Sequence, residues 1–307
     1  MSFFAILMAL LIEQARPLAH GNWVHAAVRT WLRWVVRVCD TGQRQHGWLV
    51  WSIAVLLPTA LSLLLYWAAV WLVGWPLAMV LNVFLLYACL GFRQFSHHFT
   101  EVRDALQAGD EDLAREHLSR WQHLELQDLP KDELIRQVLE SSVLAAHRHV
   151  FGVLSWFSIL AAFGLGPAGA VFYRLSEFVQ RYWPHLAQSL RQPVSDAACS
   201  AASQSWSYVD WLPARITAMC FAVVGSFEEA IDSWRQYDAD PDSSNDGVII
   251  AATSGAVNVR LGRVVQGGPS MPNPELGHLR SVVGLVWRTV VLWMVLLALL
   301  TLARLLG

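Results

Sequence analysis

Long apolar segments alternate with polar ones along this chain, and this pattern predicts membrane-spanning helices. Four segments reach about 18 residues with few ionisable side chains, which is the length that marks a spanning candidate. These segments are Leu49–Val73, Trp75–Phe92, Val150–Tyr173 and Val282–Leu306. Because every backbone amide in lipid needs an internal partner, we expect an all-α, polytopic integral membrane protein.

Two further apolar segments are shorter. The run Phe3–Ile12 ends at Glu13 and is too short to cross a bilayer of about 30 Å, so it is predicted to be a re-entrant or half-buried helix. Leu212–Phe227 contains Pro213 and Arg215. An Arg in the hydrocarbon would face protein or water, so this segment either spans with Arg215 at its interfacial end or enters and returns. The prediction is about five transmembrane helices plus the re-entrant N-terminal helix.

The arginines around the first two spans predict the orientation in the membrane. The turn Gly74-Trp75-Pro76 is uncharged, whereas arginines precede and follow the hairpin. They are Arg16, Arg29, Arg33, Arg37 and Arg44 before it, and Arg93, Arg103, Arg115, Arg120, Arg136 and Arg148 after it. By the positive-inside rule both segments belong in the cytoplasm, as in a multi-pass protein of a bacterial inner membrane.

The chain is expected to be a single membrane domain, residues 1–307, with two polar stretches on its cytoplasmic side. The larger stretch, residues 93–149, does not alternate with a period of two, and Asp110 is placed to cap a helix within it. It is therefore predicted to be a helical insert of two or three amphipathic helices. Residues 228–281 are expected to form a cytoplasmic loop.

Asn22–Val38 has a helical pattern with one basic stripe. Arg29, Arg33 and Arg37 recur every four residues, while Trp, Ala and Val side chains supply apolar surface. Two interpretations have equal weight. The segment is either an interfacial helix lying on anionic lipid or an ordinary basic face beside a membrane span.

The composition agrees with a solvent that is partly lipid. Of the 307 residues, 55% are hydrophobic and only 15% are charged, whereas a soluble domain usually carries about 25% charged residues. The net charge of −2 gives no indication of a nucleic-acid partner. The four cysteines form no CxxC pair, and the histidines between His97 and His149 are interpreted as surface residues rather than a metal site. The expected partners are the lipid bilayer and a small ligand, with homo-oligomerisation left open.

A polar run precedes a helix-like segment, Val248–Val259, and predicts an anion site. The run reads Ser243-Ser244-Asn245-Asp246-Gly247. Backbone N–H groups at a helix start, together with the helix dipole, favour an anion there, and Arg260 follows at the other end. A plain N-cap loop explains the same residues, and chemistry alone favours that interpretation.

Three charged residues outside this run are further candidates. Arg215 has a planar fork that suits a carboxylate or a phosphate, but it could equally pair with Asp210 to hold a helix start. Glu13 would be a functional carboxylate at membrane depth, or it lies in the headgroup layer. The sequence contains no phosphate-binding loop, nucleophile elbow or zinc-binding His pair.

Several motifs, in order along most of the chain, resemble those of the CobD/CbiB family of cobamide-assembly membrane proteins. The matching residues are Ala105–Asp110 with Ala114-Arg115 and Leu118; Gly166–Ala170 with Tyr173-Arg174; Trp211–Arg215 with Thr217-Ala218; and Ser243, Asn245, Gly247, Ala251, Ala252, Gly255, Ala256, Val259, Leu261 and Gly262. The resemblance implies a role in joining aminopropanol phosphate to a propionate side chain of cobyric acid. Such amide synthesis typically uses ATP and a divalent metal such as Mg²⁺ to activate the carboxylate.

The same resemblance implies a site for a phosphorylated, anionic or corrinoid-like ligand. The implied catalytic residues are Glu140, Asp210 and Asp246, and the implied ligand-binding residues are Arg215, Ser243, Asn245, Gly247, Arg260 and Glu13. The chain also departs from the family pattern. Glu140 and Gly152 remain from a motif whose Glu-Asn pair and Asp are absent here, and Asp210 stands in place of an Asn.

The chain also resembles the AmpE family. It shares the N-terminal apolar helix ending in Ile12-Glu13 and the segment Val209–Arg215. AmpE proteins are thought to be inner-membrane sensors linked to cell-wall recycling and β-lactamase induction. This second resemblance implies a non-catalytic regulator, so the sequence leaves open whether the chain is an enzyme.

Overall fold

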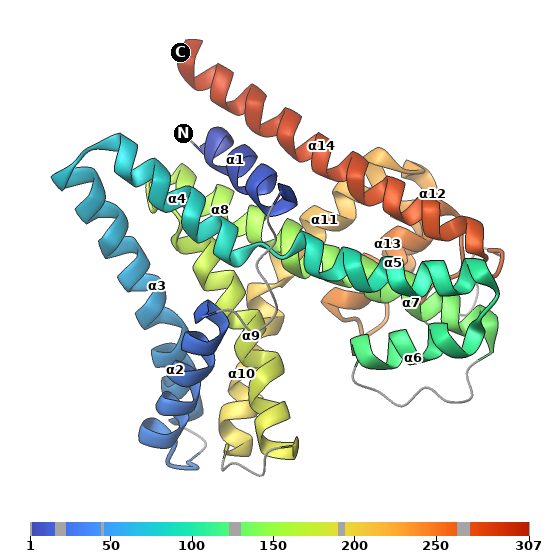
Figure 1. The fold of residues 1–307 in the computed structure, drawn as a ribbon, viewed down its shortest axis with the longest axis horizontal. Helices are drawn as coiled ribbons and strands as arrows, with labels where there is room; N and C mark the ends of the chain where they lie inside the picture. The colour runs from blue at the N-terminus through green and yellow to red at the C-terminus, as the bar shows by residue number, and fades with distance from the viewer. Residues whose placement is uncertain are drawn as a thin grey trace. The chain divides into compact units, whose positions relative to one another are not determined.

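The computed structural model describes residues 2–15, 23–43, 46–122, 130–189, 194–262 and 271–306. Within these ranges the chain is helical and contains no strand, which confirms the all-α prediction (Figure 1). Arg16 and Arg44 lie outside the described residues. The chain divides into two compact units, unit 1 (Met1–Gly91 with Arg148–Pro213) and unit 2 (Phe92–His147 with Ala214–Gly307).

Unit 1 is built from apolar and amphipathic helices that pack around α3 and α9. Its helices are α1 (Ser2–Ala15), α2 (Trp23–Cys39), α3 (His46–Leu72), α4 (Trp75–Cys89), α8 (Gly152–Ala162), α9 (Ala168–Ser189) and α10 (Asp196–Val209), and the π-helical turn η1 (His147–Phe151) leads into α8. α2, α4, α9 and α10 all contact α3, and Figure 1 shows α2 lying along it. The hairpin between α3 and α4 turns at Gly74, whose φ of 94° suits glycine.

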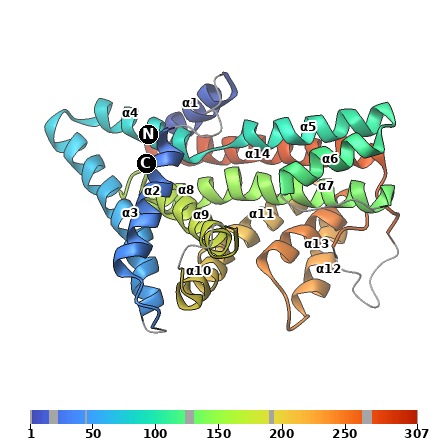
Figure 2. The same cartoon turned by 60° about the horizontal axis from the view of Figure 1, so that its bottom comes forward.

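Unit 2 contains the polar helices and the C-terminal apolar helix. Its helices are α5 (Phe92–Ala108), α6 (Glu111–Gln122), α7 (Lys131–Ala146), α11 (Trp211–Val224), α12 (Phe227–Asp238), α13 (Asn245–Val257) and α14 (Leu276–Leu306). The expected helical insert thus forms three helices, α5 to α7, and Figure 2 shows α5 and α6 beside α7. Residues 228–281, expected to be a cytoplasmic loop, contain most of α12 and all of α13, and the helix-like run expected over Val248–Val259 lies largely within α13.

Three helices are long and apolar enough to cross a membrane, namely His46–Leu72, Lys131–Ala162 and Leu276–Ala303. They agree with an integral membrane protein. The apolar helices α4 and α11 have 15 and 14 residues and are shorter than a usual span. Length therefore accounts for three of the roughly five expected spans within the described residues.

The predicted span Val150–Tyr173 is divided in the structure. Its first part belongs to the continuous helix Lys131–Ala162, and its last part belongs to α9. The break is at Gly164 and Gly166, whose φ values are 79° and 57°. Because these left-handed conformations suit glycine and Pro167 follows, the chain turns here instead of continuing as one helix.

α12 and α13 form a tight antiparallel pair in unit 2 (Figure 2). Gly255 makes this approach feasible, because a Cβ atom there would lie 2.1 Å from the carbonyl oxygen of Glu229. A residue without a side chain at this position thus allows the two helices to approach closely. The backbone N–H of Ser226 also donates to the carbonyl of Ala256, 3.1 Å away, which ties the start of α12 to the end of α13.

Candidate functional site

The N-terminus of α13 is built from the polar run that the sequence singled out. Ser244 is the N-cap residue, and its hydroxyl accepts the backbone N–H of Gly247 at 3.1 Å. Asn245 and Asp246 occupy the first turn. Ser243, one residue before the cap, is exposed and does not serve as the cap. The helix start therefore presents half-buried amide and carboxylate side chains in its first turn.

Gly247 is held in place by an aromatic ring. A Cβ atom at Gly247 would lie 1.9 Å from the hydroxyl oxygen of Tyr237, so only glycine lets this ring pack there. The hydroxyl of Tyr237 in turn accepts the backbone N–H of Ser244 at 3.2 Å. The glycine of the motif thus shapes the helix start, while the structure shows no ligand-facing role for it.

Arg215 of α11 reaches this helix start. Its Nη1 donates to the Oδ1 of Asn245 and its Nη2 to the Oδ1 of Asp238, both at 3.3 Å. The side chains of Arg215 and Asp238 are 21% and 42% exposed. The structure thus brings together two motifs that are 30 residues apart in the sequence. Asp238, which the sequence analysis did not single out, supplies the counter-charge.

Glu140 lies against the segment that follows α13. One of its carboxylate oxygens accepts the backbone N–H of Gly262 at 2.8 Å, and Arg136 donates to the carbonyl of Gly262 at 2.9 Å. Arg136 also pairs with Glu133. These hydrogen bonds hold the segment after α13 against α7. Arg260 lies in the same segment with an exposed side chain, and its backbone N–H donates to Pro272 at 2.9 Å.

Asp210 belongs to a different group of residues, in unit 1. It is fully buried, and its Oδ1 accepts the hydroxyl of Tyr173 at 2.8 Å. Gly152 makes room for this ring, because a Cβ atom there would lie 2.1 Å from the Tyr173 hydroxyl. The glycine retained from the family motif therefore supports the Tyr173–Asp210 contact. Glu13 is also buried in unit 1.

A buried ion-pair cluster on α9 was missed by the sequence analysis. Glu177 has a side chain that is 3% exposed, and it pairs with Arg174 at 2.9 Å and with Arg181 at 3.6 Å. Burial by itself raises the pKa of Glu177, but Arg174, Arg181 and Arg148 outweigh burial and hold that pKa below its ordinary value. The i, i+3 and i+4 spacing of these charges was the available signal, since such residues are neighbours on a helix.

The resemblance implies a divalent metal ion, and few carboxylates are placed to hold one. Among the described residues, no group of three or more His, Cys, Asp or Glu side chains is placed to hold a metal ion. Mg²⁺ is, however, usually held by one or two carboxylates together with substrate phosphates. At the start of α13, Asp238 and Asp246 are the carboxylates available for that arrangement.

Comparisons with known proteins agree with this architecture. Residues 2–280 match the family model described as CobD/Cbib protein. A cobalamin biosynthesis protein CobD from Stutzerimonas stutzeri is 30% identical over 265 residues, which cover 83% of this chain and 82% of that protein. A protein of the same name from Chromobacterium violaceum is 31% identical over 219 residues, covering 69% of this chain and 66% of that protein.

A more distant relative extends slightly further along the chain. The cobalamin biosynthesis protein CobD of Pelobacter propionicus is 26% identical over 271 residues, covering 87% of this chain and 79% of that protein. No solved structure matches the chain significantly. Because the family model covers nearly the whole chain and a relative of 30% identity covers most of it, this chain belongs to the CobD/Cbib protein family.

Proposed function

We propose that this chain acts in cobalamin biosynthesis, and that it joins aminopropanol phosphate to a propionate side chain of cobyric acid through an amide bond. The observation that carries the proposal is the contact between Arg215 and Asn245 at the capped start of α13. It joins two of the motifs that resemble the family. The names of the relatives support the pathway, and the chemistry of the helix start supports an anionic substrate.

The start of α13 suits a phosphate group. The Arg215 fork can donate to phosphate oxygens, and the dipole of α13 adds favourable electrostatics at its N-terminus. The partly exposed pair between Arg215 and Asp238 contributes little to stability, on the order of 0–1 kcal/mol. A substrate anion can therefore replace Asp238 as the partner of Arg215 at small cost.

Amide formation also needs a better leaving group than a carboxylate oxygen and a base for the amine proton. ATP would supply the phosphoryl group that activates the carboxylate and that would leave as phosphate when the amide forms, and Asp238 is the side chain that would hold its Mg²⁺. We assign Asp246 as the base that takes the proton from the attacking amine. For Glu140 and Asp210 a catalytic role rests on the resemblance alone, because neighbours in their own units already engage both carboxylates.

Complementation tests this proposal. The full chain should restore corrinoid production in a bacterial strain that lacks its own CobD, measured by corrinoid content at matched membrane expression. Arg215→Ala should abolish restoration, and Arg215→Lys should restore it only weakly because a lysine lacks the fork. Arg235→Ala is the matched control, since Arg235 is an exposed residue of α12 one turn before Asp238. Absence of restoration by the well-expressed wild-type chain would remove the proposal.

One observation favours an AmpE-type, non-catalytic membrane regulator as the second candidate. Where the family resemblance leads one to expect a Glu-Asn pair and an Asp, this chain carries Ser and Val residues and the segment His147-Arg148-His149. Arg148 adds positive charge around Glu177. If this candidate is correct, deleting the gene will change β-lactamase induction and leave corrinoid content unchanged.

A further inference from the structure

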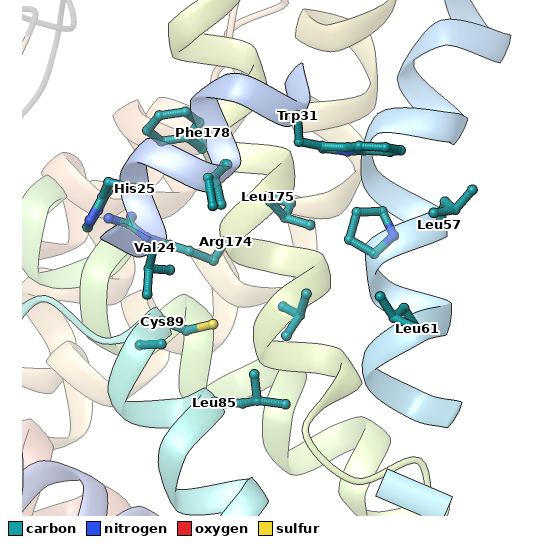
Figure 3. Close-up of a pocket in the computed structure, with 15 residues that line it drawn as sticks. Val24, His25, Trp31, Leu57, Leu61, Leu85, Cys89, Arg174, Leu175 and Phe178 are labelled. Carbon is teal, nitrogen blue, oxygen red and sulfur yellow. The ribbon is translucent and has the colours of Figure 1, made fainter. Parts of the chain in front are cut away.

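Unit 1 contains a cavity of about 370 Å³ that the proposed function does not use. It lies among α2, α3, α4 and α9, and Figure 3 shows Leu57 and Leu61 of α3 on one side of it and Leu85 of α4 below. Its volume falls within the ~300–1,000 Å³ that is typical of ligand pockets. The lining is almost entirely apolar, so the cavity suits a hydrocarbon group.

Hydrocarbon is also what surrounds this part of the chain. α3 is one of the helices long and apolar enough to cross a membrane, and its residues Leu57, Pro58 and Leu61 line the cavity near the middle of that helix. Leu57 and Leu61 are 52% and 53% exposed, so the cavity is open on their side, and its apolar lining lacks dispersion contacts there until a partner fills it. In a membrane, a lipid acyl chain is the hydrocarbon group that can fill this cavity.

One side of the cavity is cationic. Arg174 and His25 line it there, and Figure 3 shows the two side chains next to each other, across the cavity from Leu57 and Leu61. Arg174 pairs with Glu177 at 2.9 Å. A guanidinium has five N–H donors, so Arg174 can keep this partner and also donate to an anion on the cavity side.

We infer that the cavity binds one acyl chain of an anionic phospholipid, whose phosphate is held by Arg174 and His25. The apolar part takes the chain, and the cationic side selects a headgroup that carries net negative charge. The basic stripe of α2 fits this arrangement. At 100° per residue, Arg29, Arg33 and Arg37 lie on the face of α2 opposite the lining residues. Because α2 lies along α3, this stripe fits a basic face beside a membrane span, the second of its two interpretations.

Native mass spectrometry of the purified full chain tests the inference. The probes are palmitoyl-oleoyl phosphatidylglycerol and phosphatidylcholine, which share acyl chains and differ in net charge. Phosphatidylglycerol should be retained about tenfold more tightly. Leu61→Trp, which fills the cavity, should weaken that binding by about tenfold, a loss comparable to a few buried methylene groups. Leu64→Trp is the matched control, because Leu64 is on the same helix, 67% exposed and outside the lining.

A second pair of variants tests the two parts of the site separately. Ala88→Phe fills the cavity from α4 and should weaken phosphatidylglycerol binding as Leu61→Trp does. With two such variants, a folding defect in one of them does not determine the result of the test. The double variant Arg174→Gln/Glu177→Gln removes one charge of each sign and should abolish the preference for phosphatidylglycerol over phosphatidylcholine.

Three results would overturn the inference. They are equal retention of the two lipids by the wild-type chain, unchanged phosphatidylglycerol binding in both cavity-filling variants, and full displacement of the lipid by free glycerol phosphate. The last result would show that the cationic side binds a phosphate group without an acyl chain.

Discussion

The start of α13 and the cluster around Glu177 both gather arginines and carboxylates, but water reaches them to different degrees. At the start of α13, Arg215 and Asp238 are 21% and 42% exposed, and backbone and hydroxyl groups supply the other hydrogen bonds. Around Glu177, whose side chain is 3% exposed, the charges depend on one another. A partly exposed group can exchange a partner for a ligand, because water compensates the partner that is released.

A buried group has no such freedom. Removing one member of a buried ion pair leaves an uncompensated charge, whereas removing one member of an exposed pair changes little. The first group is therefore suited to exchanging a partner for a ligand, whereas the second keeps its ion pairs within α9, where they stabilise the fold. Four variants test this difference.

Glu177→Gln should have the largest effect on stability. It leaves Arg174, whose side chain is only 13% exposed, without its carboxylate partner, so the free energy of unfolding should fall by about 3–5 kcal/mol. Denaturant titration of the full chain in detergent micelles measures this change. Glu116→Gln is the control, because Glu116 pairs with Arg120 on the surface with 56% of its side chain exposed. Similar unfolding midpoints for the two variants would refute a structural role for the Glu177 cluster.

The same cluster predicts a pH dependence. The pKa of Glu177 is lowered by its arginine partners in the folded chain, so the folded state binds fewer protons than the unfolded state at low pH. Its stabilising contribution is complete above about pH 4.3, the ordinary pKa of an unfolded Glu, and is lost as the pH falls through the lower folded value. Glu177→Gln should remove this part of the acid sensitivity.

These two groups also show what could be predicted from the sequence. The cap at Ser244 and the turn at Gly247 are local, three residues apart, and turn chemistry alone indicated them. The partner of Arg215 was not predictable in this way. Asp238 is 23 residues away, on the 12-residue helix α12 that was expected to be part of a loop. Tertiary packing decides such a pair.

The long apolar helices were predicted because hydropathy over 18 residues depends little on packing. The exception was Val150–Tyr173, where two glycines in left-handed conformation turn the chain within an apolar segment. The helix that does continue, Lys131–Ala162, passes through His147, Arg148 and His149. The polarity of these residues concealed this helix in the sequence. Their neighbours in the fold, and not their sequence context, make polar residues tolerable within a long apolar helix.

Gly255→Ala should have the second-largest effect, because it forces α12 away from α13. A Cβ atom 2.1 Å from the Glu229 carbonyl cannot be accommodated without moving backbone, and overpacking of this kind costs about 1–3 kcal/mol. Gly284→Ala in α14 meets no atom within 4 Å and should be neutral or stabilise by about 0.5–1 kcal/mol through helix propensity. Equal unfolding midpoints for the two would show that the helix pair is not closely packed.

Ser244→Ala should have a smaller and local effect. It removes the hydroxyl that accepts the Gly247 N–H, and loss of an N-cap costs about 1 kcal/mol. Hydrogen exchange should become faster at the first turn of α13, with little change in α14. Ser243→Ala, at the neighbouring exposed position, should leave the exchange of the Gly247 amide unchanged. If both variants exchange alike, Ser244 does not cap the helix.

Asp238→Asn should change stability least, and it should strengthen the binding of phosphate. The pair with Arg215 is partly exposed, so its loss should cost only about 0–1 kcal/mol. The same loss removes a competitor for the guanidinium, and the binding of inorganic phosphate, measured by calorimetry, should become tighter by a few-fold. Asp232→Asn removes an exposed carboxylate from the same helix and therefore controls for the general change in charge. If Asp238→Asn destabilised the chain by several kcal/mol or weakened phosphate binding, the start of α13 would resemble the cluster around Glu177, and Arg215 would serve the fold instead of a ligand.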